Sequence, residues 1–449
     1  MITLSTQTDQ DTLTGIADIQ QKIQAQFDSL PYPVVPLDKS PQHDPEFLFI
    51  HNLVTPYYLR YRQVMNTEGM VILDAGCGSG YKALALAIAN PGAQIVGIDL
   101  SAASLELAAQ RLRHHGVTNA EFHQITLEQL PSLGMQFDYI NCDEVMSILP
   151  DVTAGLRAFK SVLKPQGIIR GNLHSARQRR NYYAAQTMFK MMHLMDGNPE
   201  ELERDIVRET MASLKDTVQL KQTTWHEQRG QDDQFILMNY LYQGDRGYTI
   251  RELFAALRAA ELEFVSMVDW HKWELLSLFK DPNNLPLFWA MSLPELSPEE
   301  RLTLFELIQP VNRLIDFWCG HPQPELAPKP VMNWSVEDWQ GATIYLHPQL
   351  RTEAVRTAMQ RSITDRTSFC ISDHLHHPAA TPITLESGVT ALLLLLWENP
   401  QPIAALVDHW QRLKPLHPVT LAPITADVAF TQVTQVLARL EMNLYVLIG

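Results

Sequence analysis

The chain has 449 residues, which is enough for two or three domains that each bury a core. Its 35 lysines and arginines against 50 aspartates and glutamates give a formal net charge of −15. A field of this sign repels phosphate-rich partners, so nucleic acid is disfavoured as a substrate or partner.

Cysteine usage and hydropathy favour a reducing, aqueous location. The four cysteines are widely separated and form no C-x-x-C pair: Cys77, Cys142, Cys319 and Cys370. Scattered cysteines are typical of a reducing compartment, and the N-terminal stretch lacks the basic and apolar segments of a secretory signal. The longest apolar run, Val389 to Trp397, is far shorter than the ~20 residues of a membrane span. We therefore expect a cytoplasmic protein without membrane association and without a bound metal.

The N-terminal region combines a short helix with a proline-rich segment. Residues 16–27 have the spacing of an amphipathic helix. Three prolines fall within six residues from Pro31 to Pro36, which predicts an extended strap. A second helical pattern covers residues 51–60 and precedes the first predicted strand.

The stretch from Val71 to Lys82 is typical of a strand, a tight glycine turn and the start of a helix. A short apolar run that ends at glycines fits a strand buried on both faces of a parallel sheet. Gly76, Gly78 and Gly80 permit turn conformations that other residues avoid. Without side chains there, a ligand is expected to meet bare backbone amides and the positive end of the following helix.

Two classes of cofactor use such a turn. The frame Gly78-Ser79-Gly80-Tyr81-Lys82-Ala83 satisfies the G-x-G-x-x-A form of dinucleotide-binding turns, so a nicotinamide oxidoreductase is one interpretation. That frame starts late, however, because Asp74 and two small residues stand ahead of it. A carboxylate there repels a pyrophosphate but suits a cationic, amino-bearing ligand. S-adenosylmethionine is such a ligand, since it carries a sulfonium and an α-amino group and has no phosphate.

The stretch resembles motif I of the class I S-adenosylmethionine-dependent methyltransferases, in which an acid after a hydrophobic run precedes G-x-G-x-G. A second apolar strand ends at Asp99, 19 residues after Gly80. This is close to the ~20-residue interval at which an acid binds two ribose hydroxyls. The resemblance implies an α/β fold: a Rossmann-like class I methyltransferase sheet with helices on both faces. It also implies S-adenosylmethionine as the cofactor, with these binding residues: Asp74, Ala75, Gly76, Cys77, Gly78, Gly80, Asp99, Leu100, Thr126, Leu127, Cys142 and Asp143.

Downstream segments extend the resemblance as far as Leu173. The family commonly has an aspartate where Thr126 stands, so the expected hydrogen bond to adenine is weaker here. The predicted fourth strand, residues 137–142, leads into Asp143 and Glu144, which border the chemistry or cap the next helix. A Leu-Lys-Pro-x-Gly element at residues 163–167 occurs at the same place in this family.

The family often folds the segment before motif I over the cofactor. Tyr57, Tyr58 and Arg60 are therefore expected to belong to a lid. In the alternative interpretation the tyrosines pack against the sheet edge and the arginine is solvated.

An insertion is expected at residues 174–247, between the fifth and sixth strands. Its first helix carries methionines at helical spacing, which favours core or lid packing. The cluster Arg177, Arg179 and Arg180 is interpreted as a solvated face, with an anchor for an anionic substrate group as the alternative. A capping box at Thr249 and Glu252 then starts a helix before the sixth strand at residues 262–268. This layout is similar to larger bacterial methyltransferases, including those that modify protein lysines.

Beyond residue 280 we predict an α-rich C-terminal accessory domain. A helix is expected from Ser297 to about Trp318, and a proline-rich linker follows at residues 320–330. The last part, with strand-like and helical pieces, is interpreted as a winged-helix-like module that mediates protein contacts or self-association and lacks the basic surface for DNA. One set of side chains suits zinc by type but is too crowded to bind it: Cys370, Asp373, His374, His376 and His377. The predicted domains are residues 1–60, 61–280 and 281–449.

The resemblance implies an enzyme that transfers a methyl group by in-line displacement. The acceptor is expected to be a protein lysine or a small metabolite such as a quinone or phenolic acid. Asp143, Glu144 and Tyr248 are candidates to take a proton from it. The alternative from another class is a catalytically silent, S-adenosylmethionine-binding regulatory or interaction protein. For a lysine acceptor, several aromatic residues are candidates for a cation cage, with core packing expected for most of them: Trp225, Tyr240, Tyr242, Tyr248, Trp270 and Trp273.

Overall fold

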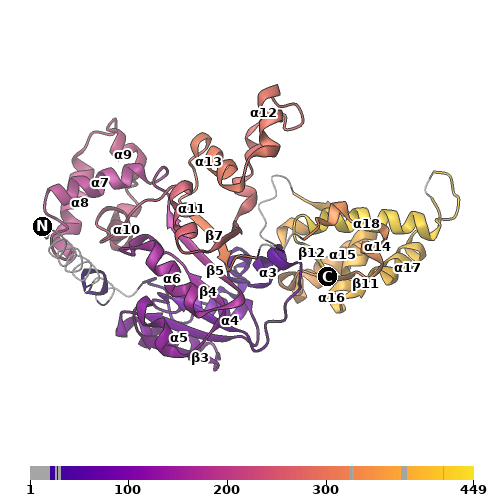
Figure 1. Cartoon of the computed structure of the whole chain (residues 1–449), viewed down its shortest axis with the longest axis horizontal. Helices are drawn as coiled ribbons and strands as arrows, with labels where there is room; N and C mark the ends of the chain where they lie inside the picture. The colour runs from indigo at the N-terminus through magenta and orange to yellow at the C-terminus, as the bar shows by residue number, and fades with distance from the viewer. Residues whose placement is uncertain are drawn as a thin grey trace, which may run out of the picture. The chain divides into compact units, whose positions relative to one another are not determined.

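The computed structural model describes residues 21–25, 28, 32–323, 325, 328–375, 382–417 and 419–449. The chain divides into two compact units, each made of separate stretches of sequence. Unit 1 is formed by the described residues of Met1–Lys39, Met70–Leu84 and Gln94–Pro322. Unit 2 is formed by those of Ser40–Gly69, Ala85–Ala93 and Gln323–Gly449. Figure 1 follows the course of the chain by colour.

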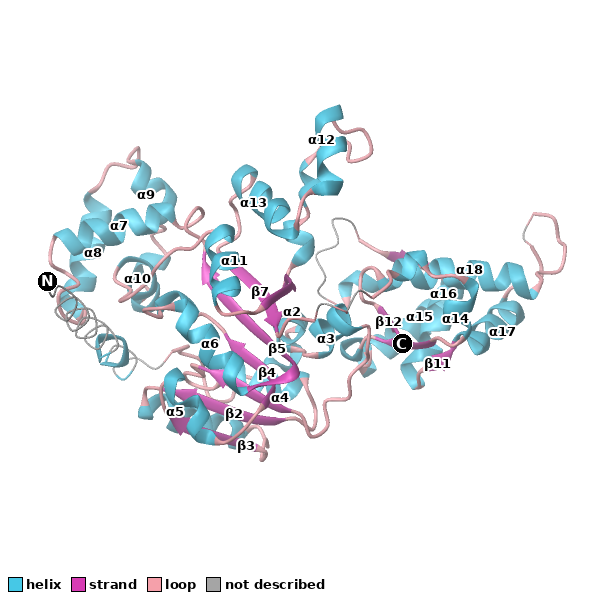
Figure 2. Cartoon of the chain, viewed as in Figure 1, coloured by secondary structure: helices cyan, strands magenta, loops and turns pink. Residues whose placement is uncertain are grey.

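Unit 1 is built on a seven-stranded sheet, with strand order β3-β2-β1-β4-β5-β7-β6 and helices around it (Figure 2). The pairs from β3 to β5 are parallel, whereas β7 runs antiparallel to both β5 and β6. The strand order reverses between β1 and β4, and ligands bind at such switch points beside the carboxyl ends of the strands. The strands are β1 (Val71–Ala75), β2 (Gln94–Asp99), β3 (Ala120–Gln124), β4 (Phe137–Cys142), β5 (Leu163–His174), β6 (Glu263–Met267) and β7 (Leu314–Gly320).

Helices pack against the sheet through buried apolar residues. Leu156 of α6, Leu253 of α11 and Phe305 of α13 share one core with Leu73 and Ile140 of the central strands. The predicted α/β fold with a Rossmann-like sheet is confirmed. The helices of this part of the chain are α4 (Tyr81–Ala89), α5 (Ala102–His114), α6 (Val152–Val162), α7 (Arg180–Met191), α8 (Glu201–Ser213), α9 (Gln219–Thr224), α10 (Asp233–Tyr240), α11 (Ile250–Ala259), α12 (Leu287–Ser292) and α13 (Pro298–Ile308).

The helix expected from Ser297 to about Trp318 is wrong in its second half. Helix α13 starts after Ser297 as predicted, with the serine and Glu300 forming a capping box, but it ends at Ile308. The residues from Leu314 onward form β7, which pairs along its length with β5 and also with β6. A buried strand that is paired on both sides gains sheet hydrogen bonds, and these outweigh a local helical pattern.

The insertion between β5 and α11 has a core of its own. Phe189, Val207, Met211 and Tyr240 are fully buried there, on helices α7, α8 and α10. The methionine stripe divides between two environments: Met188 and Met195 pack against this core, whereas Met191 and Met192 are exposed.

The arginine cluster at the start of the insertion is not a solvated face throughout. Arg179 is buried and pairs with Asp245 at 3.1 Å. Arg177 pairs with the buried Glu306 at 3.3 Å. The solvated interpretation is therefore wrong for Arg179.

Unit 2 combines helices with a three-stranded antiparallel sheet of order β11-β8-β12 and a small pair, β9 and β10. Its strands are β8 (Thr343–Leu346), β9 (Phe369–Cys370), β10 (Thr384–Leu385), β11 (Gln401–Pro402) and β12 (Val446–Ile448). Its helices are α2 (Pro45–His51), α3 (Val54–Tyr61), α14 (Val336–Gln340), α15 (Glu353–Asp365), α16 (Ser387–Glu398), α17 (Ile403–Leu413) and α18 (Ala426–Glu441).

Helix α3 is tied to the C-terminal part of unit 2. The Tyr58 hydroxyl donates to Glu441 at 2.9 Å and accepts from the Ile448 amide at 3.1 Å, and Arg62 also donates to Glu441. Tyr57 and Arg60 are buried as well. These contacts lie within unit 2, so the expected lid formed by Tyr57, Tyr58 and Arg60 is wrong.

Some of the remaining predictions can be compared with the structure only within the described residues. Residues 21–25 are helical, and the rest of the helix predicted at 16–27 lies outside the described residues. Within the described ranges no helix has the length and apolar character that a bilayer span needs. No cluster of potential metal ligands occurs in those ranges either, and His376 and His377 lie outside them. The division into domains at residues 60 and 280 stays a prediction.

Candidate active site

In the glycine loop between β1 and α4, backbone N–H groups donate hydrogen bonds to other groups of the protein. The N–H groups of Gly76 and Cys77 donate to the carbonyl of Ile98, at 2.8 and 3.0 Å. The Gly78 amide donates to Asp99 Oδ2 at 2.9 Å. A phosphate cradle needs such N–H groups free, so this loop does not suit a pyrophosphate. The expectation that a ligand meets bare amides at these positions is wrong.

A proline-rich strap crosses the glycine loop. The Ser79 amide donates to the carbonyl of Tyr32 at 2.9 Å, and its hydroxyl donates to that of Pro33 at 2.7 Å. The buried Arg111 of α5 then joins strap and loop with its guanidinium. Its carbonyl acceptors are those of Ser79, Val35 and Pro36, at 2.9, 2.8 and 2.8 Å.

The loop glycines serve this packing. A Cβ at Gly78, where φ is +50°, lies 2.1 Å from the Tyr32 carbonyl oxygen. A Cβ at Gly80 lies 2.6 Å from the backbone of Ala108 on α5. A side chain at either position collides with backbone that cannot move freely, so glycine is required by the strap and by the helix.

A small apolar cavity of about 110 Å³ lies beside the end of β2. Asp99 stands at this end, and its Oδ1 and Oδ2 accept from the amides of Ser101 and Gly78, both at 2.9 Å. Each carboxylate oxygen keeps a second lone pair for a further donor. The apolar wall is formed by Ile98, Leu100, Ile125, Leu127 and Leu149, and Thr126 also lines the cavity.

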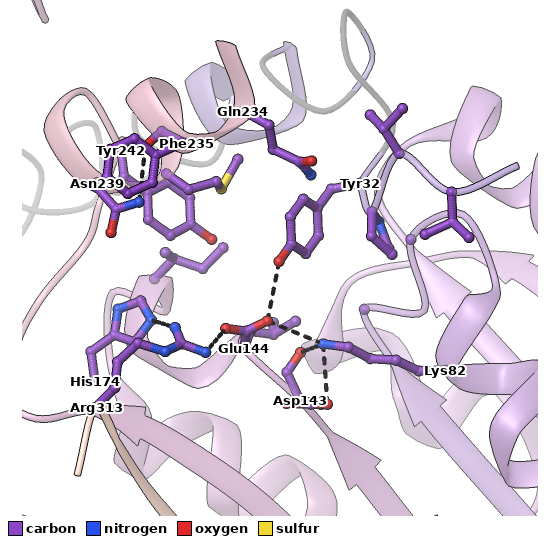
Figure 3. Close-up of a pocket in the computed structure, with 18 of the residues that line it drawn as sticks. Tyr32, Lys82, Asp143, Glu144, His174, Gln234, Phe235, Asn239, Tyr242 and Arg313 are labelled. Carbon is purple, nitrogen blue, oxygen red and sulfur yellow. Dashed lines mark hydrogen bonds and ion pairs between the residues drawn. The ribbon is translucent and has the colours of Figure 1, made fainter. Parts of the chain in front are cut away.

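A larger cavity of about 670 Å³ adjoins the first, and Gly76, Asp99 and Val145 line both. In Figure 3 the Glu144 carboxylate lies at its base. Lys82 Nζ lies 3.5 Å from Glu144 and 3.1 Å from Asp143, and Arg313 donates to Glu144 at 2.5 Å. The Tyr32 hydroxyl also donates to Glu144, at 3.3 Å.

The charge state of Glu144 follows from these partners. Burial opposes its ionisation, but Lys82 and Arg313 outweigh that effect and lower its pKa to about 2. The residue also has a left-handed backbone, with φ of +62°, which is unusual for a side chain of this kind. A carboxylate of such low pKa is a weak general base, and its ion pairs instead fix the floor of the cavity.

A buried polar network crosses the sheet behind the glycine loop. Asp74 accepts from the Asn141 amide at 2.8 Å, and Asn141 accepts from Arg170 at 3.0 Å. Arg170 forms a two-pronged pair with Asp316 of β7, at 2.7 and 3.1 Å. Asp74 Oδ2 is buried and has no hydrogen-bond partner among the described residues. Burial raises the Asp74 pKa to about 6, so this oxygen gains most from a cationic donor.

His174 ends β5 and lines the larger cavity. Its Nδ1 lies 2.6 Å from Asp245 Oδ1, and its Nε2 lies 3.4 Å from Arg313 Nη1. Burial lowers the His174 pKa, and the nearby Arg179 and Arg313 lower it further, although Asp245 opposes them. The imidazole is therefore neutral near pH 7, with Nδ1 as the donor and a lone pair on Nε2.

The two cavities bring together part of the predicted site. The predicted site residues that line the larger cavity are Gly76, Cys77, Gly78, Asp99, Asp143 and Glu144. The smaller cavity adds Leu100, Thr126 and Leu127. The described residues that line these cavities do not include Asp74, Ala75, Gly80, Cys142 or Tyr248. Tyr248 belongs to the hydrophobic core, with the Arg246 guanidinium 4.7 Å from its ring centre.

The six aromatic residues expected in a cation cage are separated. Tyr242 lines the larger cavity, whereas Trp225 and Tyr240 pack together in the insertion. Trp270 and Trp273 line another cavity, beside β6. The cage hypothesis is therefore wrong for these residues as a group.

Sequence reasoning missed several cavity residues: Tyr32, Lys82, His174 and Arg313. Arg179, which it named only as an alternative anchor for an anionic substrate group, also lines the cavity. A local signal existed for one of the missed residues. His174 follows an apolar run at the carboxyl end of a predicted strand, where ligands of open α/β sheets bind.

Comparisons with known proteins agree with this geometry. Residues 66–247 match a family model described as a methyltransferase domain. This stretch is similar to methyltransferase domains. Among solved structures, PKMT2 from Rickettsia typhi aligns with a TM-score of 0.56 at 17% identity, over 93% of this chain and 77% of that chain. A second structure of that protein, in complex with AdoHcy, aligns with the same TM-score at 18% identity, and the two show a shared fold.

Sequence relatives match different shares of this chain. An uncharacterized protein of Synechococcus sp. is 28% identical over 327 residues, which is 71% of this chain and 75% of that protein. A ubiquinone biosynthesis O-methyltransferase of Acinetobacter baylyi is 36% identical over 100 residues, which is 22% of this chain and 41% of that enzyme. The family, the fold class and S-adenosylmethionine as the cofactor were predicted from the sequence, and all three are confirmed.

Proposed function

We propose that the methyltransferase domain binds S-adenosylmethionine across the two adjoining cavities and transfers its methyl group to an acceptor in the larger one. One observation carries this proposal: Asp99 and Gly76 line both cavities, so one bound ligand can extend from one cavity into the other. The apolar cavity suits the flat adenine ring. The larger cavity, with its charged floor, leaves room for the methionine part and an acceptor.

The cofactor-binding residues have the following roles in this proposal. Asp99 accepts hydrogen bonds from the ribose hydroxyls through its unused lone pairs. Leu100, Thr126 and Leu127 surround the adenine, and the Asp74 carboxylate attracts the α-ammonium group. The remaining residues shape the turn and the wall beside it: Ala75, Gly76, Cys77, Gly78, Gly80, Cys142 and Asp143.

The bound cofactor supplies a methyl carbon that its sulfonium activates for in-line displacement. The protein aligns the acceptor with that carbon and keeps water out of the cavity. Lys82, Asp143, Glu144 and Arg313 hold one another in a fixed arrangement, which orients the cavity floor without further reorganisation.

A small acceptor is better supported than a protein lysine. The cavity volume of about 670 Å³ falls in the range of small-molecule sites, and its wall combines aromatic rings with a few polar groups. The similarity to a ubiquinone biosynthesis O-methyltransferase favours the same class. A protein partner or self-association through the C-terminal region stays a prediction.

Calorimetry with S-adenosylhomocysteine tests cofactor binding on the full chain, and heat of binding is expected. Methyl-labelled cofactor mixed with the protein and a cell lysate tests the acceptor. Label in extractable small molecules supports a metabolite, and label in protein bands supports lysine instead. Binding without transfer supports a regulatory protein. Thermal stabilisation by NAD(P) but not by S-adenosylhomocysteine contradicts the proposal.

A further inference from the structure

We propose that His174 is the general base of the methyl transfer, that Asp245 is its positioning residue, and that the acceptor is a phenol or a similarly acidic hydroxyl. This inference rests on the proposed function of the same cavity and names its substrate class. It depends on the His174–Asp245 pair and on the Arg313 guanidinium beside it.

Asp245 is held so firmly that it fixes the imidazole. Its side chain is fully buried, and one oxygen takes the bond from His174 Nδ1. The other oxygen accepts from Arg179 at 3.1 Å and from Gln186 at 2.9 Å. With both oxygens engaged, the carboxylate selects one tautomer and one ring orientation. The lone pair of His174 is then on Nε2, where it accepts a long hydrogen bond of 3.4 Å from Arg313 Nη1 in the cavity wall. In this proposal the bound acceptor hydroxyl takes the place of that donor at Nε2.

The charged groups around His174 favour a neutral base. Arg179 precedes α7, Arg313 precedes β7, and Glu144 follows β4 and pairs with Arg313. The two guanidinium groups and burial oppose an imidazolium in the resting state, which keeps Nε2 free of a proton. Asp245 stabilises the imidazolium that forms when a proton arrives, as the carboxylate of a catalytic triad does. Tyr242, whose ring centre is 6.4 Å from that of the imidazole, stays protonated because burial raises its pKa well above 10.

The proton and the electrons balance as follows. The acceptor hydroxyl gives its proton to His174 Nε2, and an oxygen lone pair forms the bond to the methyl carbon. The carbon–sulfur bond breaks with its electron pair left on sulfur, which yields a methyl ether and S-adenosylhomocysteine. His174 later returns the proton to water.

Arg313 decides between a hydroxyl and an ammonium acceptor. Its guanidinium is the charged group that contacts Nε2, and a positive charge there stabilises the negative charge that develops on oxygen. The same charge disfavours a lysine ammonium beside the base. A hydroxyl that is acidic enough to share its proton with imidazole is the better match.

Ionisation of a bound chromophore gives a direct test. The probe is 4-nitrocatechol, added to the full chain in saturating S-adenosylhomocysteine, with the absorbance of its anion followed against pH. We expect the bound probe to ionise about one pH unit or more below the free probe, because its proton passes to His174 beside Arg313. His174→Asn, His174→Gln and Asp245→Asn should lose this shift while they retain S-adenosylhomocysteine binding, which also shows that they fold.

The chain provides a matched control. His193 is exposed, and its Nδ1 lies 2.8 Å from Asp196 Oδ2, a similar pair outside the cavity. His193→Asn should leave the probe shift unchanged.

Transfer kinetics give the second readout. With 4-nitrocatechol and methyl-labelled cofactor, His174→Asn should lower kcat about 10²- to 10⁴-fold at an unchanged cofactor KM. Asp245→Asn should lower kcat and displace the pH profile, which a merely structural role does not do. A wild-type chain that binds S-adenosylhomocysteine but neither shifts nor methylates the probe overturns the inference, as does normal transfer by His174→Asn. Absence of S-adenosylhomocysteine binding overturns the proposed function itself.

Discussion

The carboxylate of Asp99 acts on the backbone as well as on a ligand. It holds the Gly78 and Ser101 amides, and so fixes the glycine loop and the start of α5 relative to β2. The oxygens that do this are the same ones that the proposed function assigns to ribose. A change at this residue is therefore expected to affect affinity more than the loss of one contact suggests.

Asp99→Ala should weaken S-adenosylhomocysteine binding about 10- to 100-fold, equivalent to about 1.5–3 kcal/mol for lost hydrogen bonds to a charged group. Isothermal calorimetry measures this change. Asp99→Asn, which keeps one carbonyl oxygen, should lose less. The control is Asp408→Ala, at an exposed position on α17. Equal affinity of Asp99→Ala and the control contradicts the role of Asp99.

Asp74 makes stability depend on pH. Burial raises its pKa from 3.8 to about 6, so the folded state binds this proton more tightly than the unfolded chain does. The contribution of Asp74 to the free energy of unfolding is therefore full below about pH 4 and is lost as the pH rises through 6.

Urea unfolding of the wild type and of Asp74→Asn between pH 4 and pH 7 measures this contribution. The wild type should lose up to about 3 kcal/mol more than the variant over that interval, because the asparagine does not titrate. Asp316 titrates in both proteins and cancels in the difference. A difference that does not change with pH, or that grows in the other direction, contradicts the raised pKa.

At the scale of elements, the strap and the glycine loop behave as one piece. Gly78 and Gly116 both have positive φ, but only Gly78 faces backbone within reach of a Cβ. Comparing their alanine variants separates the cost of crowding from the cost of backbone strain.

Gly116→Ala should lower the free energy of unfolding by about 1–2 kcal/mol, the cost of a left-handed alanine. Gly78→Ala should lower it by about 2–5 kcal/mol, since overpacking is added. Denaturant titration measures both variants, and calorimetry should find weaker S-adenosylhomocysteine binding only for Gly78→Ala. Equal destabilisation by the two variants shows that the strap yields easily.

The pair between Arg170 and Asp316 connects β5 and β7 inside the sheet. Arg170→Leu should cost about 3–5 kcal/mol, because it leaves the Asp316 carboxylate buried without its partner. The double variant Arg170→Leu with Asp316→Leu should be more stable than the single variant, and a double-mutant cycle in urea measures the coupling. Strictly additive losses contradict a direct pairing.

At the scale of the whole molecule, features that depend on nearby residues were predicted from the sequence, whereas contacts between distant residues were not. From Val71 to Leu173 the order of strands and the acids at their ends were predicted, since each depends on a few neighbouring residues. Tyr32 and Arg313 meet Glu144 across 112 and 169 residues, and no local pattern reports such convergence. For β7 the local pattern even favoured a helix, and pairing with two distant strands decided otherwise.

Unit 2 offers a test of how far the two units act independently. Glu441→Ala removes the acceptor of both Tyr58 and Arg62, and the free energy of unfolding should fall by about 2–4 kcal/mol. S-adenosylhomocysteine affinity should stay unchanged, because the proposed binding residues all lie in unit 1.

Glu398→Ala is the matched control for this change. Glu398 pairs with Arg356 at 2.7 Å, but it is exposed, and loss of such a pair should cost less than about 1 kcal/mol. Thermal unfolding and calorimetry on both variants check the expectation. A large fall in affinity for Glu441→Ala shows that the units are coupled.

The hydrogen bond between Tyr58 and Glu441 can form only after a delay during synthesis of the chain. Its two residues are 383 positions apart, so at about 5–20 residues per second the ribosome needs about 20–80 s to deliver the second after the first. Throughout that interval Phe49, Leu53 and Tyr57, all buried in the finished protein, lack the segment that completes their unit. We therefore expect the nascent chain to expose an apolar N-terminal segment while the sheet of unit 1 forms, and we expect a chaperone to bind this segment during synthesis.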